Sequence, residues 1–163
     1  MNAKNFSCLV KKCAHSCPPV ILCIGSSKII SDCYGPTVGY LLQNEYPLNA
    51  FVYGSLYKPV NALNLQATLS QIRIKHPHSK IIAVDSFLSS LDKDEIKLIN
   101  GSIKPGLASG KNLPEVGDLS IIASSATFGK NTYCMGKVLS LAQITAKLLH
   151  LSIPLTVATS RSL

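Results

Sequence analysis

Two aspartates each follow an apolar run of the kind that forms a buried strand. Asp32 stands in the turn after VILCI at residues 20–24, and Asp85 comes directly after KIIAV at residues 80–84. In an open α/β sheet, functional groups gather in the crevice outside the carboxyl ends of the strands. If the two strands are neighbours, we expect both carboxyl groups to face one crevice.

A pair of close carboxyl groups has a distinctive chemistry. Ionising both groups at once is energetically unfavourable, because the two negative charges repel each other. The pKa of one group therefore rises, and the pair keeps a proton, which lets it activate a water molecule as base and acid. The same two residues also suit a simpler role, because Asp commonly closes a turn or caps a helix by accepting hydrogen bonds from local backbone N–H groups. The residue pattern alone leaves both interpretations open.

A glycine-rich segment, PGLASGKNLPEVGD, occupies residues 105–118. Its glycines, among them Gly106 and Gly110, could serve only to let the chain turn sharply. Alternatively, the segment lies beside the crevice and presents Lys111 and backbone N–H groups to a substrate, as functional loops do.

Cysteine and histidine crowd the N-terminal segment as Cys8, Cys13, His15 and Cys17. The spacing C-x4-C-x-H-x-C offers soft ligands but lacks the paired C-x2-C knuckles typical of structural zinc sites. We therefore expect no metal ion and no cofactor, and free thiols in a reducing cytoplasm. Cys33 is a minor alternative nucleophile, because no histidine partner is evident in the sequence.

The elements that must position these residues alternate in type along the chain. Apolar runs predict strands at residues 20–24, 51–56, 80–84 and 119–123, and helical spacing covers residues 36–45, 63–72 and 133–150. This order predicts an α/β fold, a single-domain three-layer sandwich with a mostly parallel central sheet and helices on both faces. Asn100-Gly101 between apolar residues predicts an inserted β-hairpin. We expect residues 1–18 to form an irregular or weakly helical N-terminal arm and residues 19–163 to form the single domain.

Three segments resemble the signatures of the YyaC-type sporulation proteins. They are SDCYGPTVG at residues 31–39, IIAVDSFL at 81–88 and IKPGLASGKNLPEVGD at 103–118, and VYGSLYKPVNALNL at 52–65 also resembles that type. The YyaC type is similar in turn to the spore germination protease. The resemblance covers most of the chain in order and implies the α/β fold shared by germination proteases and hydrogenase-maturation proteases.

The resemblance also implies roles for individual residues. In the germination protease, an atypical aspartic peptidase, two aspartates carry the chemistry, and they match Asp32 in the D-x-x-G-P motif and Asp85 after the apolar strand. The third signature implies that Gly106, Gly110 and Lys111 bind substrate. This chain departs from the YyaC-type pattern at residues 26–27, where Ser-Ser replaces Thr-Asp, so it lacks an acidic ligand that a metal site of the hydrogenase-maturation type would need.

The expected function follows from the resemblance. It is a spore-associated peptidase that hydrolyses peptide bonds with the aspartate pair in sporulation or germination, in the cytoplasm of the developing spore. Its expected partner is a protein or peptide substrate, with small acid-soluble spore proteins as candidates. The alternative is a catalytically inactive sporulation protein that uses the peptidase fold as a protein-binding module.

Composition narrows the classes of partner. The chain has 163 residues, 47% of them apolar, with 16 Lys and Arg against 8 Asp and Glu and a net charge of +8. The basic residues are scattered and not interleaved with aromatic residues, so we expect no specific nucleic-acid partner. No apolar run reaches the roughly 18 residues that span a membrane, so we expect no membrane partner. The sequence does not determine the oligomeric state.

Overall fold

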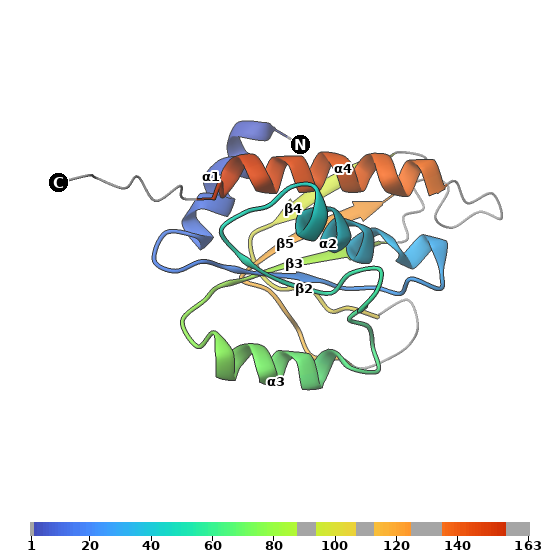
Figure 1. Ribbon diagram of the computed structural model, residues 1–163, viewed down its shortest axis with the longest axis horizontal. Coiled ribbons are helices and arrows are strands. Elements are labelled where there is room, and N and C mark those ends of the chain that lie inside the picture. The colour runs from blue at the N-terminus through green and yellow to red at the C-terminus, as the bar shows by residue number, and fades with distance from the viewer. Residues whose placement is uncertain (1, 88–93, 107–112, 125–134, 156–163) are drawn as a thin grey trace.

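The computed structural model describes residues 2–87, 94–106, 113–124 and 135–155 of the chain (Figure 1). Its described residues form one five-stranded sheet in the order β2-β1-β3-β5-β4. The strands are β1 (Val20–Cys23), β2 (Phe51–Tyr53), β3 (Ile81–Ser86), β4 (Glu95–Ile99) and β5 (Leu119–Ser124). Strands β2, β1, β3 and β5 pair in parallel, and β4 pairs antiparallel to β5. The prediction of a mostly parallel sheet is confirmed.

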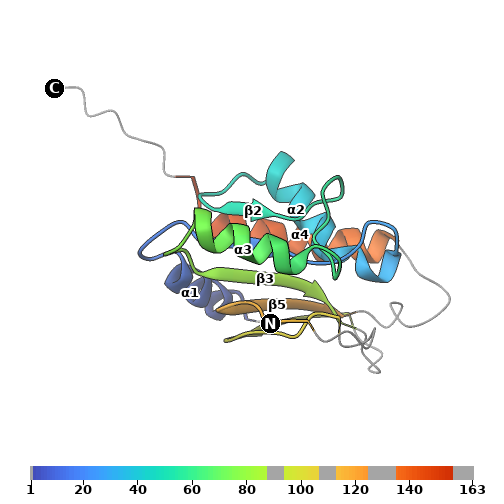
Figure 2. The ribbon, with the colours of Figure 1, turned by 90° about the horizontal axis from the view of Figure 1, so that it is seen from below.

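Helices cover both faces of this sheet. Helices α1 (Ala3–Cys13), α2 (Tyr34–Asn44) and α4 (Met135–Ser152) lie on one face, and α3 (Leu65–Lys75) lies on the other (Figures 1 and 2). Side chains alternate along β1, so that Ile21 packs in the core with α1, α2 and α4, whereas Leu22 packs with α3. A buried hydrogen bond of 2.7 Å between the hydroxyl groups of Tyr34 and Thr145 joins α2 to α4. The three-layer sandwich is confirmed.

The N-terminal segment is more regular than we expected. Residues 3–13 form a complete α-helix, whose first turn is capped by the Asn2 side chain accepting a hydrogen bond from the Lys4 N–H at 2.9 Å. Phe6 and Val10 are fully buried in the main core. They lie four residues apart and therefore on one face of the helix, a short apolar stripe that the neighbouring polar residues mask in the sequence. The division of the chain after residue 18 stays a prediction.

The antiparallel insertion is present, but its turn does not lie at Asn100-Gly101. Strand β4 pairs with β5, with Ile96 opposite Ala123, and Ile103 forms a bridge with Val116. The expected pairing across Asn100-Gly101 was therefore wrong. The physical reason is burial: β5 offers β4 a largely buried partner strand, which a tight local hairpin would not.

The second strand also ends earlier than predicted, at Tyr53. Gly54 has φ +87°, and a Cβ atom on it would lie 2.0 Å from the carbonyl oxygen of Cys23. This close approach turns the chain out of the sheet. Among the described residues, no helix combines the length and apolar character needed to cross a membrane.

Candidate functional site

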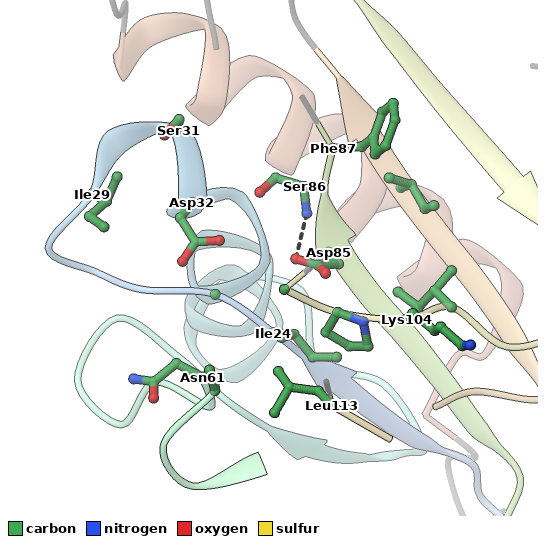
Figure 3. Close-up of a pocket in the computed structure, with 16 residues that line it drawn as sticks. Ile24, Ile29, Ser31, Asp32, Asn61, Asp85, Ser86, Phe87, Lys104 and Leu113 are labelled. Atoms are coloured by element: carbon green, nitrogen blue, oxygen red, sulfur yellow. Dashed lines mark hydrogen bonds between the residues drawn. The ribbon is translucent and has the colours of Figure 1, made fainter. Parts of the chain in front are cut away.

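The two aspartates lie at the carboxyl ends of neighbouring strands. Strands β1 and β3 pair directly, with Cys23 opposite Val84. Within the sheet, β2 is the neighbour of β1 on one edge and β3 is its neighbour on the other edge. The chain therefore runs from β1 to β2 in one direction across the sheet and then returns to β3 in the other, so the strand order reverses between β1 and β3. Such a reversal opens a crevice at the carboxyl ends of the strands. Asp32 and Asp85 both line a cavity of about 500 Å³ there, and Figure 3 shows the two side chains near one another, on different segments of the chain.

The D-x-x-G-P motif holds Asp32 against the end of β1. A Cβ atom on Gly35 would lie 2.0 Å from the carbonyl oxygen of Ile24, and one on Gly25 would lie 2.1 Å from the carbonyl oxygen of Asp32. The N–H of Ser26 donates a hydrogen bond of 2.9 Å to that same Asp32 carbonyl. Two glycines thus let the start of α2 touch the exit of β1. This contact holds Asp32, two residues before α2, beside the crevice.

Asp32 does not cap helix α2, and Asp85 lies inside a strand. Asp32 ends the short 3-10 helix η1 (Ile30–Asp32), and the N-cap of α2 is Cys33, with no side chain bonded to the helix start. Asp85 lies within β3 opposite Ile122 of β5, and its Oδ1 accepts a hydrogen bond of 2.8 Å from the Ser86 N–H. The helix-capping interpretation is therefore wrong for Asp32 at α2. Residues 88–93, where a short helix after Asp85 would lie, are outside the described residues, so that interpretation stays a prediction for Asp85.

Burial gives the two carboxyl groups unusual acidities. Asp85 is only 8% exposed, and desolvation, opposed by the Ser86 N–H and reinforced by the charge of Asp32, raises its pKa to about 8. Burial also raises the pKa of Asp32 above its ordinary value, and hydrogen bonds from the Ser26 N–H and the Ser86 side chain oppose that rise. Of the two carboxyl groups, Asp85 is the more buried and the one whose pKa rises furthest, so it keeps its proton to the higher pH.

The cavity walls are largely apolar. Large hydrophobic side chains from segments scattered along the chain line it, among them Ile24, Ile29, Phe87, Ile103, Leu113 and Ile122. Ile29 and Phe87 are each 55% exposed, so they form the rim rather than the floor. Lys104 also lines the cavity, and its Nζ lies 3.3 Å from a carboxylate oxygen of Glu115. Apolar walls explain why burial dominates the acidity of the pair, because they cannot solvate a charge.

The glycine-rich segment reaches this cavity. Gly106 lines it, with φ +74°, next to Lys104 and Pro105. Gly110 and Lys111 lie outside the described residues, so their role in substrate binding stays a prediction.

Cys33 is not part of the cavity lining. Its thiol is 1% exposed, and its Sγ lies 3.5 Å from the Thr37 hydroxyl oxygen. No histidine lies among the described lining residues. The structure therefore does not support Cys33 as a nucleophile, because a buried thiol that has no neighbouring base and that a substrate cannot reach cannot attack that substrate.

The N-terminal cysteines fall in different surroundings. Cys8 is exposed, Cys13 is buried and Cys17 is intermediate. In the part of the chain that the structure describes, no group of three or more His, Cys, Asp or Glu side chains could hold a metal ion. The expectation of no metal ion and no cofactor stays a prediction.

Sequence reasoning missed several polar residues of the site, among them Ser86 and Asn61. Ser86 contacts both aspartates, through its N–H to Asp85 and through its side chain to Asp32, and its position directly after Asp85 was an available signal. Asn61 lines the cavity because the loop after β2 returns to β1, where the Gly25 N–H donates to the Val60 carbonyl at 2.8 Å. That contact is non-local, and no local motif predicts it.

Comparison with known proteins identifies the family. A family model described as "Protein of unknown function (DUF1256)" matches residues 2–150. The chain belongs to this DUF1256 family. The uncharacterized protein YyaC of Bacillus subtilis (strain 168) is 37% identical to it over 105 residues, which cover 64% of this chain and 51% of YyaC. The chain thus matches about half the length of this relative, and no solved structure matches the chain. The YyaC-type resemblance is confirmed, and the similarity to the germination protease stays a prediction.

Proposed function

We propose that this protein is a peptidase that hydrolyses peptide bonds with the Asp32–Asp85 pair. One observation carries the proposal: two carboxyl groups share a largely apolar cavity, and burial raises the pKa of Asp85 to about 8. A structural carboxylate would instead be expected to have a lowered pKa from ion pairs, and pairs of carboxyl groups with separated acidities are typical of acid–base sites.

The proposed reaction divides the roles between the two residues. Asp32, as the carboxylate, accepts a proton from a water molecule, and the water oxygen forms a bond to the carbonyl carbon of the substrate. Asp85 donates its proton to the carbonyl oxygen from Oδ2, because Oδ1 already accepts the Ser86 N–H. The C–N bond then breaks, the amine leaves with the proton that Asp32 had taken, and a hydroxyl proton returns to Asp85, which restores the starting state.

The proposed substrate is a protein or peptide chain of the spore. The family resemblance supports small acid-soluble spore proteins as candidates and the cytoplasm of the developing spore as the place of action. The apolar rim formed by Ile29 and Phe87 suits an uncharged substrate side chain beside the scissile bond.

The decisive experiment removes one ionisable group at a time. Purified protein, Asp32→Asn and Asp85→Asn are incubated with small acid-soluble spore proteins and with a mixed peptide library, and cleavage is followed by mass spectrometry. Asn keeps the shape of Asp but cannot ionise, so each variant should lose a factor on the order of 100 or more in kcat. Glu45→Gln, which neutralises an exposed carboxylate directly after the C-terminal end of α2, is the matched control and should retain full activity.

Equal cleavage by the wild type and both variants would contradict the proposal. The second candidate, a protein-binding module, is favoured by the Ser26-Ser27 departure from the family pattern. It would be supported if the wild type cleaves no substrate but captures a spore protein in a manner that depends on the two aspartates.

A further inference from the structure

The outer edge of β2 is an open edge of the sheet. β2 is the first strand in the sheet order and pairs only with β1 among the described residues. The Phe51 N–H donates to the Pro19 carbonyl at 2.9 Å, so the backbone polar groups of Phe51 face β1. Because these groups alternate in direction along a strand, the N–H and carbonyl of Val52 face outward. Within the part of the chain that the structure describes, the Val52 carbonyl accepts only a long hydrogen bond of 3.5 Å from the side-chain amide of Gln43.

A trough of about 730 Å³, lined by both polar and apolar residues, runs along this edge. Gln43 of α2 lines one side and Thr68 and Gln71 of α3 line the other, so the helices on the two faces of the sheet flank the edge strand (Figure 1). Its described lining contains one charged residue, the exposed Lys58, and no carboxylate. Tyr57, 82% exposed, adds an aromatic surface.

The trough leads toward the aspartate cavity. Asn61 belongs to the lining of both. The loop that contains Asn61 is tied to the end of β1 by the parallel bridge between Ile24 and Val60. A ligand that leaves the trough at its Asn61 end therefore arrives at the carboxyl ends of the strands, where Asp32 and Asp85 lie.

We propose that this trough binds an extended segment of the polypeptide substrate, which adds to the edge of β2 as a further strand and directs the adjoining segment to the aspartate pair. The inference rests on the proposed peptidase function. Strand addition satisfies the outward N–H and carbonyl of Val52 through main-chain hydrogen bonds, while side-chain contacts in the trough provide selectivity. The lone positive charge of Lys58 favours a segment that carries a carboxylate side chain.

The test measures binding separately from turnover. Short capped peptides are screened on the Asp85→Asn protein, and the Kd of one labelled binder is measured by fluorescence anisotropy. Val52→Pro removes the outward N–H without removing a hydrogen bond to β1, a change that edge strands tolerate. It should weaken binding about three- to tenfold, the effect of one hydrogen bond. Gln71→Trp fills the trough and should weaken binding further, whereas Gln66→Trp, on the same helix outside the trough, is the matched control and should not.

Each outcome separates the inference from the proposed function. Peptide binding that both trough variants leave unchanged, or no peptide binding at all, overturns the inference. A dimer that depends on Val52 in sedimentation experiments, without peptide binding, assigns the edge to a second copy of the chain and also overturns it. Binding that the trough variants weaken, in a protein that cleaves nothing, supports the trough while the peptidase function fails. Aspartate-dependent cleavage with an unchanged KM in the trough variants supports the peptidase function and overturns the inference about the trough.

Discussion

At the scale of single residues, surroundings make two identical side chains different acids. Asp85 sits in a central strand with 8% of its surface exposed, and Asp32 sits at a helix end where it is less buried. Desolvation is the first cause of the raised pKa in both cases, and the larger shift falls on the more buried group. Ser86 contacts both groups and hydrogen bonds to each.

The raised pKa of Asp85 predicts a specific dependence of stability on pH. The group has a pKa of about 8 in the folded protein against an ordinary value of 3.8, so between these values the folded chain binds more protons than the unfolded chain. The contribution of Asp85 to the free energy of unfolding is complete below about pH 4 and is lost as the pH rises to about 8. Over this range the free energy of unfolding falls by at most about 1.4 kcal/mol per pH unit. Asp85→Asn cannot ionise and does not suffer this loss.

Thermal melts of the wild type and Asp85→Asn across this range measure the effect. The Tm of the variant minus that of the wild type should increase as the pH rises, by about 2–4 °C for each kcal/mol, and level off above about pH 8. Glu45→Gln should follow the wild type throughout. A Tm difference between Asp85→Asn and the wild type that is independent of pH would show that Asp85 is ionised in the folded protein.

At the scale of elements, the contact between the exit of β1 and the start of α2 positions the catalytic candidate. Gly35 occupies the second position of α2, where no side chain fits beside the Ile24 carbonyl. The contact also makes the glycine of the D-x-x-G-P motif a packing requirement. The D-x-x-G-P motif therefore contains both the candidate catalytic residue, Asp32, and the glycine, Gly35, that allows α2 to pack against the end of β1.

Gly35→Ala should destabilise the protein and displace Asp32 together. The added Cβ would lie 2.0 Å from a backbone oxygen, so α2 must shift, at a cost of about 1–3 kcal/mol. Gly136→Ala is the matched control, because Gly136 is the exposed second residue of α4, where Ala is expected to be neutral or to stabilise by up to about 1 kcal/mol. Urea unfolding gives the stabilities and peptide cleavage gives the activity; equal stabilities of the two variants would contradict the close packing of α2 on β1.

At the scale of the whole molecule, the N-terminal helix is part of the main core. Phe6, Val10 and Cys13 of α1 are buried together with residues of α2, α4 and the sheet. This face of the sheet therefore carries three helices, whereas α3 and its neighbouring loops cover the other face. The aspartate cavity and the trough along β2 both lie away from α1, so α1 contributes to stability rather than to either site.

Phe6→Ala should therefore lower the free energy of unfolding without changing the site. Phe6 is fully buried, and truncating a buried Phe costs about 3–5 kcal/mol. Cys8→Ala, on the exposed side of the same helix, should change stability by less than about 0.5 kcal/mol. Denaturant unfolding of both variants is the measurement, and a small effect of Phe6→Ala would mean that α1 detaches from the core in solution.

The sequence by itself determined the types of the main elements and the two candidate residues. Continuous apolar runs ending in Asp or in a Gly-containing turn are local patterns, and they predicted β1, β3 and β5, the mostly parallel sheet, and the positions of Asp32 and Asp85 after their strands. The N-terminal helix was predicted only as an irregular or weakly helical arm, because polar neighbours masked its short apolar stripe. The partner of β4 escaped prediction because a local turn signal competed with a distant strand.

Only the tertiary structure decided that β1 and β3 are neighbours, and hence that the two carboxyl groups share one cavity. Strand order depends on contacts between residues far apart in the chain, which no local pattern encodes. The same holds for the apolar walls around the pair and for the trough beside β2, which are assembled from separate segments. Because burial raises the pKa of Asp85 and burial is a property of the assembled fold, its acidity followed from the structure and not from its place in the sequence.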